Sequence, residues 1–108
     1  MNLARLLLRA ARSFGERPAV YEGKRLVHHY RSLAQRSAAL AGYLVHECGL
    51  RAGDRVALIL HNHPSYIELL FAIWHSGLVA VPVNAKLHPR EFAYILQHSG
   101  AKLCFSER

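Results

Sequence analysis

The segment that says most about the fold is GDRVALIL at residues 53–60. Gly53 and Asp54 form a turn signal, and the run from Val56 to Leu60 is apolar throughout. A strand with one face in water alternates apolar and polar residues, whereas an unbroken apolar run of this length is typical of a strand covered on both faces. The segment therefore predicts a central strand with helices on either side of its sheet.

The residues after this strand predict a helix and a second strand. Pro64 suits the first turn of a helix, where an N–H group would have no intrahelical partner, and Gly77 suits a left-handed cap at the other end. Residues 78–83 are short and apolar, which favours a strand. Pro82 lies near the end of this run, where a proline is tolerated.

The same pattern occurs once more in residues 89–105. Pro89 opens a helical pattern, Gly100 follows it, and residues 102–105 have the composition of a third strand. The order strand, helix, strand, helix, strand favours a parallel sheet with right-handed crossovers. We therefore expect an α/β fold with a βαβαβ unit.

The first half of the chain begins with an amphipathic pattern. Residues 2–14 predict a helix with an apolar stripe on one side and arginines on the other. The stripe consists of Leu3, Leu6, Leu7, Ala10 and Phe14, and the opposite side carries Arg5, Arg9 and Arg12. We expect the helix to pack on its own domain, since no small-residue cleavage site is evident. Organelle targeting or peripheral membrane association is the alternative, because the helix has no acidic residue.

A small hairpin and a second helix are expected next. Residues 19–21 and 26–30 have the composition of strands, and a glycine-containing turn at residues 22–25 separates them. Ser32 is the expected N-cap of the following helix, which Gly49 ends.

The composition fits one compact unit. The chain has 108 residues, of which 52% are hydrophobic and 19% charged, and a chain of this size buries roughly 65% of its unfolded surface. No linker, repeat or low-complexity segment divides it. We expect one incomplete domain over residues 1–108, with a helix-hairpin-helix part at residues 1–50 and the βαβαβ unit at residues 51–108.

The chain is basic, with a net charge of +7 when its histidines are neutral. Its arginines and lysines are scattered rather than massed, and no zinc-finger, helix-turn-helix or aromatic RNA-binding signature accompanies them. We expect a solvated basic surface and no nucleic-acid partner. The longest stretch without formal charge, residues 69–85, is broken by His75, Gly77 and Pro82, so no transmembrane segment is expected.

Few residues have the spacing that catalysis or metal binding requires. Cys48 and Cys104 are far apart and lack metal-ligand spacing, so we expect reduced core thiols and a cytoplasmic location. His61 and His63 lie where the first parallel strand ends, a common ligand site in open sheets, but no third metal ligand accompanies them. The glycines match neither the dinucleotide nor the Walker pattern of a phosphate loop. We therefore assign no catalytic, cofactor-binding or metal-binding residue.

Five short motifs occur in a specific order. They are GLxxGDRVAL at residues 49–58, NxP at 62–64, VPVN at 81–84, LxPxE at 87–91 and SGAK at 99–102. Together they resemble the start of an adenylate-forming enzyme of the AMP-binding synthetase and ligase family, and the resemblance covers essentially the whole chain. Departures at His29, Ser32, His61, His63 and His88 affect caps and loops.

The resemblance implies the N-terminal part of the large domain of such an enzyme. The chain is most similar to fatty-acid and other carboxylic-acid CoA ligases, which use ATP to form an acyl-adenylate and then an acyl-CoA. In that family the phosphate loop and the catalytic lysine lie downstream of this segment. The resemblance therefore implies ATP, Mg²⁺ and CoA only for the full-length enzyme, and we expect the isolated chain to be inactive.

A second hypothesis is a free-standing α/β interaction module that docks on a partner chain. Its docking surface would be the sheet edge and apolar face left open at Phe105. A ligase fragment would instead have the rest of the ligase polypeptide as its partner, and a homodimer is compatible with both hypotheses. The sequence leaves open which acid is activated, whether CoA accepts it, and whether Arg108 is the natural terminus.

Overall fold

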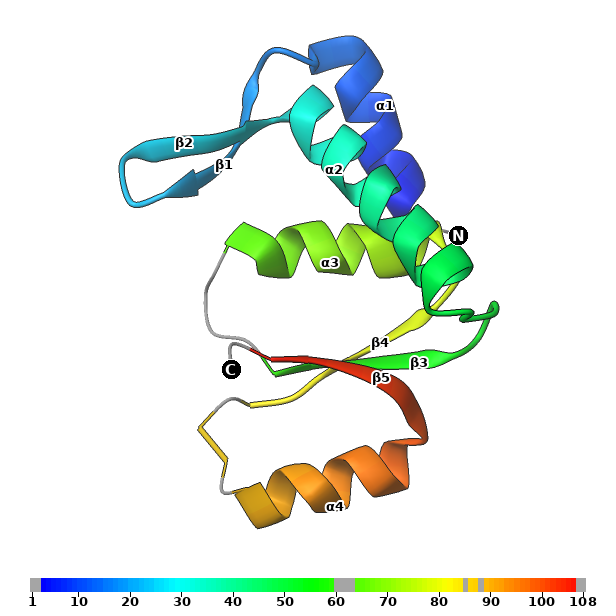
Figure 1. Cartoon of the computed structure of the whole chain (residues 1–108). Helices are drawn as coiled ribbons and strands as arrows, with labels where there is room; N and C mark the ends of the chain where they lie inside the picture. The colour runs from blue at the N-terminus through cyan, green and yellow to red at the C-terminus, as the bar shows by residue number, and fades with distance from the viewer. Residues whose placement is uncertain (1–2, 60–63, 85, 88, 107–108) are drawn as a thin grey trace.

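The computed structural model describes residues 3–59, 64–84, 86–87 and 89–106 (Figure 1). Its elements, in chain order, are α1 (Ala4–Phe14), β1 (Pro18–Glu22), β2 (Arg25–His29), α2 (Tyr30–Gly42), a π-helical turn (Tyr43–Glu47), β3 (Arg55–Ile59), α3 (Pro64–His75), β4 (Val79–Pro82), α4 (Pro89–Ser99) and β5 (Ala101–Ser106). The predicted α/β class and order of elements are confirmed. Across the described residues, no helix combines the length and the apolarity that a bilayer crossing requires.

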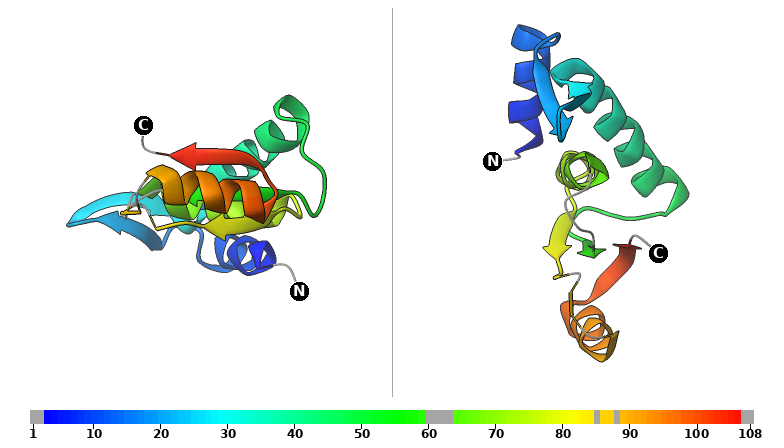
Figure 2. Two further views of the ribbon diagram at one scale, coloured as in Figure 1. Left: turned by 90° about the horizontal axis from the view of Figure 1, so that it is seen from below. Right: turned by 90° about the vertical axis from the view of Figure 1, so that its left-hand side faces the viewer.

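The central strand of the parallel sheet is β3, and the strand order is β4-β3-β5. Val56, Ala57 and Leu58 of β3 are each 0% exposed, so the strand is covered on both faces, as the apolar run predicts. From β3 the chain first adds β4 at one edge of the sheet, and it then passes back across β3 to add β5 at the other edge. Right-handed crossovers in opposite directions require helices on opposite faces, and Figure 2 shows α3 and α4 on the two sides of the sheet.

Two apolar cores lie on the two sides of α3. The larger core joins α2, the π-helical turn, β3 and α3, and its buried members are Ala41, Leu44, Leu50, Val56, Leu58, Leu69, Ala72, Ile73 and Leu78. The smaller core joins α1, α2 and α3, and its members are Leu7, Leu33 and Ala34, with Ile67 and Phe71 partly buried against them. Because α3 is apolar on both sides, it connects the sheet to the N-terminal helices (Figure 1).

The face of the sheet toward α4 is covered less completely. Leu103 and Phe105 pack on the larger core, so Cys104, which lies between them in β5, faces the α4 side and is exposed. Val79 of β4 is 44% exposed, and no residue of α4, which is described throughout, is fully buried. The prediction that Cys104 is a core residue is therefore wrong, because it lies on an edge strand and on the open face.

Two glycine turns hold the amino ends of the strands together. Gly53 and Gly77 adopt left-handed backbone conformations, with φ of 88° and 74°, and the N–H of Gly53 donates to the carbonyl of Gly77 at 2.9 Å. The Asp54 carboxylate accepts the N–H of Arg51 at 2.9 Å. The Gly-Asp pair thus supplies a positive φ and a closed turn immediately before β3, and the predicted cap at Gly77 is confirmed.

The predicted hairpin is present as the antiparallel pair β1 and β2, but the helix after it differs from expectation. His29 occupies the N-cap position without a side-chain cap. Ser32 lies inside α2 and its hydroxyl donates to the carbonyl of His29 at 3.1 Å, so the prediction of Ser32 as the N-cap is wrong. The helix widens over Tyr43–Glu47 before Gly49 ends it at φ 69°, a change that a regular helical period does not indicate.

Only part of the predicted apolar stripe of α1 is buried. Of its members Leu7 is buried and Ala10 is half-buried, whereas Leu3, Leu6 and Phe14 are 44%, 51% and 47% exposed. The expectation that α1 packs on its own domain is thus confirmed through Leu7. The exposed members of the stripe do not pack on the rest of the chain, because α2 and α3 contact only one side of the helix.

Leu44 and Val45 are neighbours in the π-helical turn with opposite surroundings, 0% and 38% exposed. We expect Leu44→Ala to lower the free energy of unfolding by about 3 kcal/mol, because it leaves a cavity in the larger core. Val45→Ala should lower it by less than about 0.5 kcal/mol. Urea unfolding followed by circular dichroism measures both losses, and equal losses would contradict the placement of Leu44.

Candidate functional site

The carboxyl edge of the parallel sheet is where this topology favours a ligand. The crossover after β3 runs over one face and the crossover before β5 runs over the other, and open α/β sheets bind ligands where neighbouring strands diverge in this way. The strand ends at this edge are Ile59, Pro82 and Ser106, which offer one hydroxyl and no charge. His61 and His63, the candidate metal ligands of this edge, lie outside the described residues.

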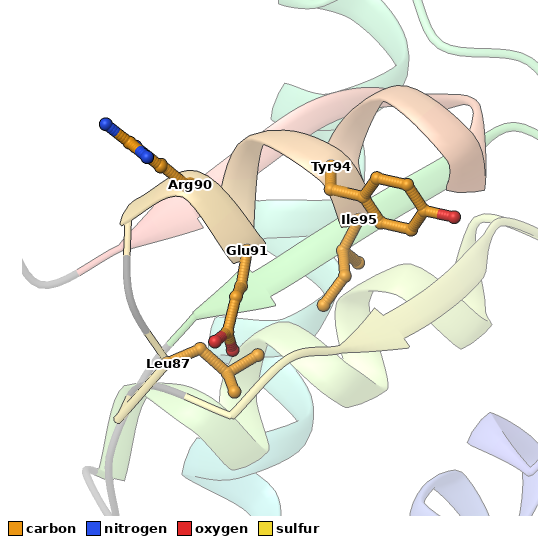
Figure 3. A pocket seen from close by; sticks show the side chains of 5 residues that line it. All are labelled: Leu87, Arg90, Glu91, Tyr94 and Ile95. Atoms are coloured by element: carbon orange, nitrogen blue, oxygen red, sulfur yellow. The ribbon is translucent and has the colours of Figure 1, made fainter.

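A shallow groove of about 430 Å³ lies beside α4 (Figure 3). Its lining residues are Leu87, Arg90, Glu91, Tyr94 and Ile95. Glu91 points toward Leu87, while Arg90 points away from the other lining residues. Tyr94 is 64% exposed and its ring centroid lies 4.1 Å from that of His98. Such a groove suits an apolar side chain of a covering surface, and no buried polar group among its lining residues converges to orient a substrate.

A polar network connects β2, α2 and α3. The Glu68 side chain is 11% exposed and its carboxylate accepts from His28 Nε2 at 3.2 Å and from Arg36 Nε at 3.1 Å. The Ser32 hydroxyl, which donates to the carbonyl of His29, lies 3.0 Å from His28 Nδ1. The network therefore fixes the hairpin to two helices through one buried carboxylate.

Ser32, His28 and Glu68 have the residue types of a hydrolase triad, but their bonds do not suit that chemistry. A nucleophilic serine gives its proton to the histidine, whereas the single hydroxyl hydrogen of Ser32 is directed to a backbone carbonyl. Glu68 is shared with Arg36, so it is not reserved for orienting the histidine. The network is a structural link.

One residue in the sequence indicates this network, but local sequence patterns do not identify its partners. Glu68 is the only Asp, Glu, Lys or Arg in α3, whose other residues are mostly apolar. Its partners Arg36 and His28 are 32 and 40 residues away in the sequence, so only the packing of α2 and β2 on α3 identifies them.

Metal and thiol chemistry have little support among the described residues. No three or more His, Cys, Asp or Glu side chains there are placed to hold a metal ion; His88, like His61 and His63, falls outside that part of the chain. Cys48 and Cys104 are free, and partial burial raises the pKa of the Cys104 thiol. A raised pKa keeps the thiol protonated and poorly nucleophilic at neutral pH.

The chain is similar to known ligases along nearly its whole length. Residues 7–108 match the family model described as AMP-binding enzyme. The chain is 45% identical over 93 residues to a long-chain-fatty-acid–CoA ligase of Haemophilus influenzae, covering 86% of this chain and 16% of the relative. It is also 45% identical over 74 residues to a feruloyl-CoA synthase of an Amycolatopsis species, covering 68% of this chain and 15% of the relative.

The fold is similar to that of a solved subdomain. The N-terminal subdomain of NpsA from Klebsiella oxytoca, in complex with 3-hydroxyanthranilyl-AMSN, matches with a TM-score of 0.90 at 29% identity, over 99% of this chain and 27% of that one. The chain thus corresponds to a small part of each of these proteins, and spans only 15–16% of the length of the two curated relatives.

Removing the buried carboxylate should destabilise the fold more than removing an exposed one. We expect Glu68→Ala to lower the free energy of unfolding by about 2–3 kcal/mol, because it leaves His28 without its acceptor. Glu22→Ala is the matched control, since Glu22 and Arg25 form an ion pair with side chains 49% and 73% exposed, and should cost less than about 1 kcal/mol. Equal losses in urea unfolding would contradict a structural role for the network.

Proposed function

This chain belongs to the AMP-binding enzyme family, and we therefore propose that it is the N-terminal part of an ATP-dependent fatty-acid–CoA ligase. Such an enzyme forms an acyl-adenylate from a carboxylic acid and ATP, and then transfers the acyl group to CoA. The observation that carries the proposal is the 45% identity to a long-chain-fatty-acid–CoA ligase over 86% of this chain. The similarity to a feruloyl-CoA synthase also supports a carboxylic acid as the substrate class.

The described residues do not fit a binding site for ATP or Mg²⁺. A phosphate loop follows a strand and leads into the amino end of a helix. Gly53, Gly77 and Gly100 instead precede the strands β3, β4 and β5, at the opposite edge of the sheet. In our proposal the nucleotide, Mg²⁺ and CoA are held elsewhere in the ligase, and no residue of this chain is catalytic.

The role left for this segment is that of a scaffold completed by the rest of the ligase. Residues 1–108 would form an incomplete domain, divided into the helix-hairpin-helix part at 1–50 and the βαβαβ unit at 51–108. The remaining polypeptide would cover the open α4 face and pair with the outer edge of β5. The free thiols of Cys48 and Cys104 and the use of ATP and CoA favour a cytoplasmic location.

A free-standing module that docks on a partner chain is the second candidate. The same open face supports it, since Val79 and Tyr94 are 44% and 64% exposed. In this case the occupant would be another protein or a second copy, giving a homodimer. Such a module would need no further ligase polypeptide for its function.

A chimera in which this chain replaces the aligned segment of the H. influenzae ligase tests the proposal. We expect it to form palmitoyl-CoA from palmitate, ATP and CoA within about tenfold of the parent rate, because this segment supplies scaffold and the parent supplies the catalytic groups. The 108-residue chain alone should show no ATP–pyrophosphate exchange.

Two variants of the chimera serve as matched controls. Leu44→Asp, at a buried position, should abolish activity, whereas Val45→Asp, at the exposed neighbouring position, should retain it. A chimera that unfolds cooperatively but makes no acyl-CoA would contradict the proposal. Pyrophosphate exchange by the 108-residue chain alone would also contradict it, since it would place catalytic groups in this segment.

A further inference from the structure

We draw no further inference here: the strongest candidate, the shallow groove beside α4 that Leu87, Tyr94 and Ile95 help to line, carries nothing beyond the proposed function, because nothing among the described residues shows what covers it in a chain that spans 16% of the length of its ligase relative.

Discussion

Burial of β3 on both faces determines how the helices are arranged around the sheet. Val56, Ala57 and Leu58 have no exposed surface, so the sheet needs a helix layer on each side. With right-handed crossovers and β3 in the middle, α3 and α4 must lie on opposite faces. The second apolar side of α3 then requires its own cover, which α1 and α2 provide.

The two faces of the sheet differ in completeness, and this difference connects the fold to the proposed function. On the α3 side, the larger core is closed and the Glu68 network joins the hairpin to the helices. On the α4 side, no helix residue is fully buried and a groove stays open beside Tyr94. A scaffold segment of a much longer ligase would have this form. Its N-terminal half would be packed within the segment, and further polypeptide would pair with its last strand, β5.

The sequence predicts the helices and strands of this fold better than it predicts which of their faces are buried. The apolar run at β3 and the glycines at 53 and 77 identify strands and caps because backbone conformation restricts the residue at those positions. Periodicity defines an apolar stripe on α1, but it cannot tell which flank meets a neighbour, so Leu7 is buried and Leu6 is exposed. Cys104 has the same limitation in β5, where strand alternation does not say which face is covered.

Side-chain networks are harder still to predict, because they depend on distances between elements. Glu68 is unusual within an apolar helix, yet its contacts with Arg36 and His28 arise only when α2 and β2 pack on α3. The motif order predicts the family correctly without predicting these contacts. Family membership and local backbone chemistry are therefore accessible from this sequence, whereas the packing of its surfaces is not.

Amide hydrogen exchange of the 108-residue chain tests whether β3 and α3 form a closed core while the α4 face is open. We expect the amides of Val56–Leu58 to exchange slowest, near the limit set by global unfolding, and those of α4 to exchange at least about a hundredfold faster. Equal protection of α3 and α4 would contradict it, because it would show that both faces of the sheet are closed within this chain.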